Sequence, residues 1–192
     1  MVDPPPSSRD AWTVRHIVAT MFPLLMVLSG LEMISGMVLE GVEETYLTNP
    51  TLFVLVPVMI GMGGNLGSIF ASRLSTRLHL GTLSFELRDE TLWTNVVAIV
   101  GLGTTIFVLL GLAAWVVGQV ITDSPLPIVD LLQVSVISGL LLTGSAILLA
   151  IGATYVSFVR GYDPDDTTIP VVTNLCDILG VVILSAVALV VL

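Results

Sequence analysis

The sequence predicts an all-α membrane protein with five transmembrane helices. Hydrophobic residues make up 55% of the 192 residues, charged residues only 11%, and the mean hydropathy is +1.02. The apolar residues gather in five runs, each long enough to cross about 30 Å of hydrocarbon as a helix. Backbone polar groups in lipid must find partners within their own span, so these runs are expected to be helices rather than open strands.

The five expected spans follow one another with short polar links. They cover about residues 14–41, 50–80, 92–120, 126–158 and 167–192, after a short tail of residues 1–13. Residues 14–192 are therefore expected to form one transmembrane domain. The fourth span contains small residues of the kind that let helices approach closely. These are Ser135, Ser138, Gly139, Gly144, Ser145 and Gly152.

All basic residues are predicted to lie on one side of the membrane. The chain has no lysine, and its arginines fall in the tail and the start of the first span, in the polar end of the second span and the link after it, and in the link after the fourth span. They are Arg9, Arg15, Arg73, Arg77, Arg88 and Arg160. The positive-inside bias makes that side cytoplasmic. A multi-pass protein of the cell membrane is expected, with a cytoplasmic N-terminus and an extracellular C-terminus.

The charge balance excludes a nucleic-acid partner but leaves other questions open. Fifteen acidic residues give a net charge of −9, which is the opposite of a basic nucleic-acid footprint. The excess is explained equally by chance in a small set of polar loops or by an acidic surface adapted to high salt. The one cysteine, Cys176, lies in an apolar span and is predicted to be a small buried hydrophobe.

The fifth span contains one carboxylate, Asp177, deep in an otherwise apolar run. It lies on the order of 15 Å past the start of that span, close to the middle of a bilayer. A carboxylate at that depth is costly and usually marks an ion or proton path. Thr173 and Asn174 lie one turn before it, and Pro170 and Gly180 share its face. Oxygen ligands of this kind suit hard cations such as Mg²⁺ or Ca²⁺.

The second span carries a stripe of small and amide residues. Gly61, Gly64, Asn65, Ser68 and Ser72 fall on one face at helical spacing. Such a stripe is typical of a water-lined path, and it is also typical of a close crossing between two helices. Asn65 favours the path, because an amide at that depth needs a polar partner.

Acidic residues continue toward the predicted outer face. Glu32 lies about two-thirds of the way along the first span, too deep for a solvated loop. It is expected to be functional or to be buried against Asn65 or an arginine. Glu43 and Glu44 follow in the outer link. They would raise the local concentration of cations, although an ordinary solvated loop explains them as well.

Two segments resemble the MgtE magnesium channels and the related solute-carrier magnesium transporters. The first resembles the family through Glu43-Glu44, Pro57, the run Gly61-Met62-Gly63-Gly64-Asn65-Leu66-Gly67, Arg73 and Arg77. The second does so through Asp163-Pro164, Pro170, Thr173, Asp177 and Gly180. The resemblance implies a homodimer of ten helices with its ion pathway along the subunit interface. It also implies that Asp177 binds a largely hydrated Mg²⁺ near Gly64 and Asn65.

The chain departs from that family in one respect. The MgtE channels carry large cytoplasmic sensor regions before the membrane part, whereas only about thirteen residues precede the first span here. A stand-alone membrane unit is therefore expected, and gating by such a sensor is not carried over.

These observations predict a divalent-cation transporter, with Mg²⁺ as the transported ion and no organic cofactor. Its expected metal-binding residues are Asp177, Asn65, Thr173, Asn174, Gly64 and Glu32. The alternative is a Na⁺- or H⁺-coupled carrier in which Asp177 titrates. An enzyme is not expected, because intramembrane aspartyl chemistry needs paired deep aspartates and only Asp177 lies deep. A membrane subunit without transport activity is the third class.

Overall fold

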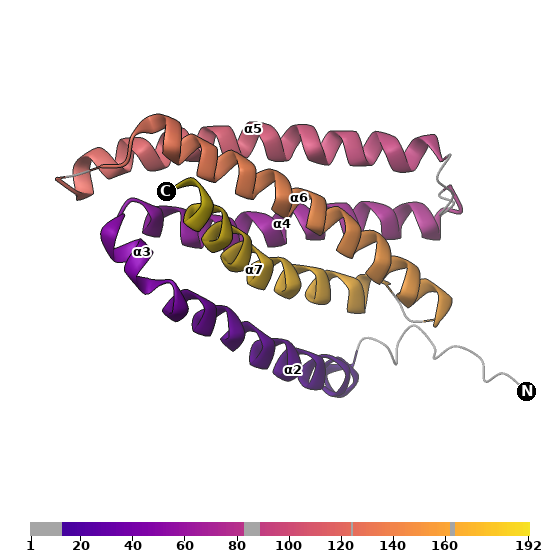
Figure 1. Ribbon diagram of the computed structural model, residues 1–192. Coiled ribbons are helices and arrows are strands. Elements are labelled where there is room, and N and C mark those ends of the chain that lie inside the picture. Colours follow the sequence, from indigo (N-terminus) through magenta and orange to yellow (C-terminus); the bar gives the residue numbers. More distant parts are fainter. Residues whose placement is uncertain (1–12, 83–88, 124, 162–163) are drawn as a thin grey trace, which may run out of the picture.

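The computed structural model describes residues 13–82, 89–123, 125–161 and 164–192, and all of its regular structure there is helical (Figure 1). The helices are α2 (Val14–Gly41), α3 (Glu43–Thr48), α4 (Leu52–His79), α5 (Glu90–Ile121), α6 (Ile128–Val159) and α7 (Pro164–Val191). Five of them are long and apolar enough to cross a membrane. The predicted all-α class and the predicted number of spans are therefore confirmed.

Several sequence features lie outside the described residues. They include nearly all of the predicted tail with Arg9, the segment that holds Arg88, and Asp163 of the second family motif. For Arg9 and Arg88, the predicted cytoplasmic side therefore rests on their positions in the sequence alone.

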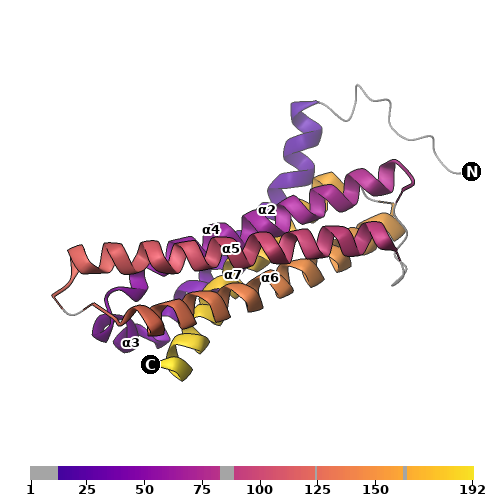
Figure 2. The ribbon, with the colours of Figure 1, turned by 90° about the horizontal axis from the view of Figure 1, so that it is seen from above.

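Helix α7 is the centre of the bundle. It packs against α4, α6 and α2, while α5 covers α6 and α4 on the far side (Figure 1). Helix α2 packs mainly on α7, and Figure 2 shows its N-terminal half diverging from the other helices. Leu28 is the one buried hydrophobic residue among the described side chains of α2. The C-terminal helix is thus enclosed on three sides, whereas the first long helix is held loosely.

Helix α3 lies where the sequence predicts only a polar link. Its Tyr46 is fully buried, and the Tyr46 hydroxyl lies 3.1 Å from Ser185 Oγ of α7. The Tyr46 ring also lies 5.2 Å from the ring of Phe53 in α4. Burial raises the pKa of Tyr46 above its usual value, and the hydrogen bond to Ser185 opposes part of that rise. One aromatic side chain therefore fastens the α2–α4 link to both α7 and α4.

Small residues bring α5 and α6 together. Gly139 of α6 lies directly against the Phe107 ring of α5. Ser135 Oγ donates a hydrogen bond of 2.8 Å to the Phe107 carbonyl, and Gly103 of α5 lies against Thr143. A glycine on each helix accepts a larger side chain from the other, which lets the two backbones approach closely.

The packing predicted for the small residues of the fourth span is correct for only part of the set. Ser135, Ser138 and Gly139 are buried. Gly144 and Gly152 are exposed, and a Cβ atom at either would meet nothing within 4 Å. The packing prediction is therefore wrong for these two glycines within the chain, because they lie on the opposite face of α6.

The α5–α6 contact predicts that Gly139→Ala destabilises the protein. An added methyl group would overlap the Phe107 ring, and overpacking of this kind costs about 1–3 kcal/mol. The measurement is the thermal unfolding midpoint in detergent. Gly144→Ala is the matched control, since it makes the same change on the same helix in open space. Equal midpoints for the two variants would contradict this account of the interface.

Candidate ion pathway

The α4 and α7 helices cross closely at their midpoints. Gly64 lies near the middle of α4 and Asp177 near the middle of α7. A Cβ atom at Gly64 would lie 2.9 Å from Asp177 Oδ1 and 2.9 Å from Thr173 Cγ2. Any side chain at this position would therefore push Asp177 or Thr173 away. The glycine places the α4 backbone directly against the carboxylate.

Two further glycines extend this crossing. A Cβ atom at Gly67 would lie 2.6 Å from Val172 Cγ1 and 3.2 Å from Cys176 Sγ. A Cβ atom at Gly180 would lie 3.1 Å from the Met59 carbonyl oxygen of α4. Glycines from both helices thus hold the backbones together over several turns. Cys176 is fully buried in this contact, as expected for a small apolar side chain.

The oxygen-bearing residues of α7 lie together beside Gly64. Thr173, Asn174 and Asp177 are all half-buried. The Thr173 carbonyl oxygen lies 3.6 Å from the Cβ position of Gly64, on the same side as the Asp177 carboxylate. Asn174 Nδ2 donates a hydrogen bond of 3.0 Å to the Pro170 carbonyl. The amide nitrogen is thereby engaged within α7, so Oδ1 is the atom of the Asn174 side chain that could accept a cation.

Glu32 of α2 brings a second carboxylate to the site. It is half-buried and close enough to Asp177 for the two charges to interact. Ser35 Oγ donates a hydrogen bond of 2.6 Å to the Glu32 carbonyl oxygen, one turn farther along α2. Neither carboxylate has an ion-pair partner in the part of the chain that the structure describes. The charge of Glu32 acts on Asp177, and no hydrogen bond or ion pair joins the Glu32 carboxylate to Asn65 or to an arginine among the described residues. The other expectation, that Glu32 is functional, stays a prediction.

The predicted stripe on α4 divides between two surroundings. Gly64 is buried in the crossing with α7, while Asn65, Gly61 and Ser72 are exposed and Ser68 is half-buried. A Cβ atom at Gly61 would meet nothing within 4 Å. Close packing thus accounts for Gly64, and a polar outward face accounts for the other members. The structure does not bring the Asn65 side chain into the buried contact.

The site has few charged ligands. Among residues 13–82, 89–123, 125–161 and 164–192, no three His, Cys, Asp or Glu side chains come together as a metal-binding group. One chain therefore supplies two neighbouring carboxylates and several neutral oxygens. This donor set suits a cation that keeps most of its water shell and does not suit a closed tetrahedral site.

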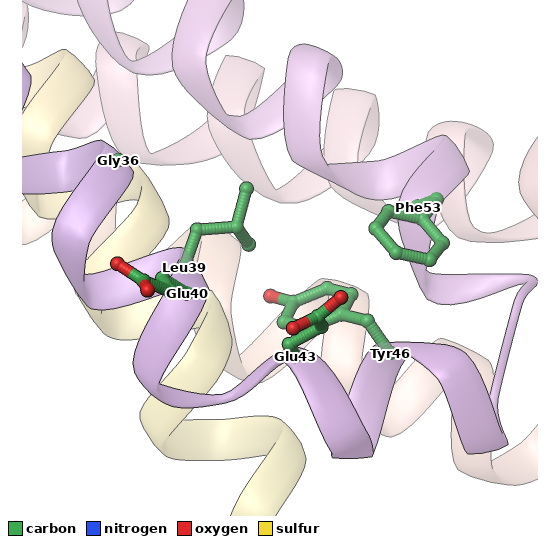
Figure 3. A pocket seen from close by; sticks show the side chains of 6 residues that line it. All are labelled: Gly36, Leu39, Glu40, Glu43, Tyr46 and Phe53. Atoms are coloured by element: carbon green, nitrogen blue, oxygen red, sulfur yellow. The ribbon is translucent and has the colours of Figure 1, made fainter.

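An acidic pocket of about 340 Å³ lies at the α3 end of the bundle (Figure 3). Its lining residues are Gly36, Leu39, Glu40, Glu43, Tyr46 and Phe53. Glu40 lies at the C-terminal end of α2 and Glu43 begins α3, and both are exposed. A separate hollow beside the end of α7 is lined by Glu44. The adjacent residues Glu43 and Glu44 therefore line two different hollows.

The amino-acid sequence alone does not identify the Tyr46–Ser185 pair. The two residues lie 139 positions apart, and the packing of α3 on α7 brings them together. A buried tyrosine hydroxyl usually needs a polar partner, so an isolated tyrosine beside an apolar span was the signal available.

Comparison with known proteins gives a consistent result. The sequence profile of the MgtE family, described as a divalent cation transporter, matches residues 56–187. The magnesium transporter MgtE of Thermus thermophilus is 30% identical over 166 residues, which cover 86% of this chain and 34% of that protein. Human solute carrier family 41 member 2 is 25% identical over 178 residues, which cover 88% of this chain and 30% of that protein.

A third relative is mouse solute carrier family 41 member 3, which is 31% identical over 153 residues, or 69% of this chain and 30% of that protein. The chain thus spans about a third of the length of these relatives. The profile match includes the α4–α7 crossing, with Gly64 and Asp177. The chain belongs to the MgtE family of divalent cation transporters.

Proposed function

We propose that this chain transports Mg²⁺ across the cell membrane and binds the partly hydrated ion near the membrane midplane. Asp177, Thr173 and Asn174 would supply ligands from α7, and α4 would border the ion at Gly64 and Asn65. The family supports a divalent cation, and the relative named as a magnesium transporter supports Mg²⁺ as that cation. The observation that carries the proposal is the half-buried Asp177 at the helix midpoint, beside Glu32 and without a cationic partner among the described residues.

The electrostatics of the site favour a bound cation. Two neighbouring carboxylates repel each other, and the repulsion grows as water is removed from around them. A divalent cation between them or beside them converts that repulsion into attraction. Mg²⁺ loses its water reluctantly and is usually held by one or two carboxylates with several waters retained. Half-buried ligands leave room for such waters.

The acidic residues of α2 and α3 would supply an approach to this site. Glu40 of α2 and Glu43 of α3 line the pocket at the α3 end, and Glu32 lies about two turns from Glu40 toward the middle of α2. Ser68 follows one turn after Gly64 on α4. A cation would thus pass from an acidic pocket to the carboxylates of Glu32 and Asp177 and on past the Ser68 hydroxyl.

We extend the proposal to a homodimer with the cation on its two-fold axis. The exposed Asn65 supports it, because an amide facing lipid would lack hydrogen-bond partners. A second copy of the same surface would cover Asn65 and bring a second Asp177 toward the first, as closed two-fold symmetry requires. The N-terminus would be cytoplasmic and the C-terminus extracellular, according to the arginine distribution.

A Na⁺- or H⁺-coupled carrier is the second candidate. The observation that favours it is the Glu32–Asp177 pair, because two neighbouring carboxylates can also exchange a metal ion for monovalent cations or protons. Uptake that requires an imposed Na⁺ or proton gradient would select this candidate.

The central experiment is Mg²⁺ uptake into proteoliposomes that contain the purified chain, followed with a Mg²⁺-sensitive dye. Asp177→Asn removes the charge while keeping the size, and uptake is expected to fall by at least about tenfold, which corresponds to roughly 1.4 kcal/mol. Asp130→Asn, on α6 outside the site, is expected to retain wild-type uptake. If wild-type liposomes take up no divalent cation, the proposed function is wrong.

Gly64→Ala tests the geometry of the crossing. The added methyl group would come within 2.9 Å of Asp177 Oδ1 and displace the carboxylate from α4. The expected result is a higher KM for Mg²⁺ uptake, in a protein that still folds. Gly101→Ala makes the same change on α5, away from the α4–α7 crossing and with nothing within 4 Å, and its KM is expected to remain unchanged. Equal KM values for both variants would show that Gly64 does not position the site.

Glu32→Gln tests the second carboxylate. Loss of its charge is expected to weaken Mg²⁺ binding less than loss of Asp177 does, since Asp177 alone lies against α4. The measurement is the Mg²⁺ dissociation constant of the purified protein for both single variants and the double variant. Strictly additive effects would mean that the two carboxylates do not share one ion.

A further inference from the structure

A basic pocket lies at the opposite end of α4 from the acidic one. It has a volume of about 260 Å³ and is lined by Ser72, Arg73, Thr76 and Arg77. Its lining thus consists of two guanidinium groups and two hydroxyl-bearing side chains, all from the last two turns before the helix end at His79. The guanidinium groups and the Ser72 hydroxyl can donate hydrogen bonds into the pocket, and no lining residue carries negative charge.

The two arginines have no acidic partner among the described residues. Arg73 and Arg77 are one helical turn apart, so their charges lie on neighbouring positions of one face and repel each other. Arg77 forms no ion pair in the described parts of the chain, and Arg73 bonds only to a neutral amide. In a chain with fifteen acidic residues, two adjacent uncompensated arginines form a local site for an external anion.

Arg73 is held in position from a neighbouring helix. Its Nε donates a hydrogen bond of 2.6 Å to Asn95 Oδ1 of α5. The Asn95 side chain is only 3% exposed, and its Nδ2 donates a bond of 2.7 Å to the Thr91 carbonyl. The bond through Nε fixes the plane of the guanidinium and leaves its terminal nitrogens for a ligand. A buried amide therefore preorganises an exposed charge, as a binding site requires.

The charges at the C-terminal end of α4 favour an anion in this pocket. A favourable charge at the C-terminal end of α4 accounts for one basic residue there, because that end of a helix carries about half a negative charge. The positive-inside bias accounts for further arginines at this end, but neither effect requires that Arg73 be oriented by a buried amide of α5. Two full positive charges also outweigh the opposing half charge, so an anion is attracted to this pocket overall.

We propose that Ser72, Arg73, Thr76 and Arg77 form a binding site for a phosphate group. Guanidinium groups bind phosphate oxygens through paired, charge-assisted hydrogen bonds, and the Ser72 hydroxyl would add a further donor. Thr76 Oγ1 donates a hydrogen bond of 2.9 Å to the Ser72 carbonyl, so Thr76 lines the pocket without supplying a donor to the anion. The pocket lies at the end of a transmembrane helix, at the level where phospholipid head groups meet the protein. The phosphate would belong to an anionic lipid head group or to a small phosphate compound in solution. Binding at this site does not depend on cation transport.

The experiment compares two sources of phosphate. The purified chain is reconstituted in phosphatidylcholine nanodiscs with or without phosphatidylglycerol, and lipids retained per chain are counted by native mass spectrometry. Inorganic phosphate is titrated separately by calorimetry. The test variant is Arg73→Gln/Arg77→Gln, and the control is Arg160→Gln, which removes one exposed arginine at the end of α6 outside the pocket.

Retention of phosphatidylglycerol by the wild type and by Arg160→Gln, with at least about a fivefold loss in the double variant, would establish the lipid form of the site. Saturable phosphate binding that the double variant loses would establish the soluble form. If the double variant does not fold, Asn95→Ala is used, and a partial loss is expected because Arg73 is no longer oriented. Equal retention and equal phosphate binding in all variants would overturn the proposal.

Discussion

The close contact between α4 and α7 is the constraint on which the rest of the structure depends. Three glycines allow it: Gly64 and Gly67 from one helix and Gly180 from the other. Without side chains at these positions, the two backbones approach to the point where a carboxylate oxygen takes the place that a methyl group would occupy. Transmembrane helices gain most of their association energy from such packing, because lipid is as apolar as the side chains themselves. One contact therefore both stabilises the bundle and places a charged group.

The other helices are arranged around this contact. Helix α6 packs against both α4 and α7. Helix α5 packs on α6, with a glycine of each helix against a larger side chain of the other. Asp177 is consequently bordered by the α4 backbone on one side, and the charge of Glu32 acts on it from the α2 side. The α4 backbone closes one side of Asp177, and the side toward Glu32 is only half-buried. This arrangement favours an ion that is bound through its waters, because such an ion keeps its shell and does not need to be fully enclosed by protein.

Much of this could be predicted from the sequence, because hydrocarbon imposes a simple length rule. The five apolar runs predicted the five long helices, and the depth of Asp177 in its run made it the leading candidate for an ion site. Periodicity also placed Thr173 and Asn174 beside it. The glycines were harder to assign. Helical spacing puts residues on one face of a helix, but it does not say which neighbour that face meets, so Gly61 and Gly64 had the same prediction and different surroundings.

Contacts between distant parts of the chain were beyond the sequence. The Arg73–Asn95 bond and the Tyr46–Ser185 pair depend on the relative rotation of two helices, which no local pattern encodes. Helix α3 was missed because six residues are too few to show a period, and its stability comes from burying Tyr46. Glu32 shows the same limit: its depth ruled out a loop, but its partner was fixed only by how α2 lies on α7.

The loose packing of α2 has a mechanical consequence for the charged pair. Glu32 lies on a helix that buries one large apolar side chain among its described residues, while Asp177 lies on a helix that packs against α4, α6 and α2. The Coulomb energy of two charges varies inversely with their separation. The separation of the two carboxylates is therefore set by the least constrained member of the bundle. A small tilt of α2 changes the field felt by a cation without altering any contact between α4 and α7.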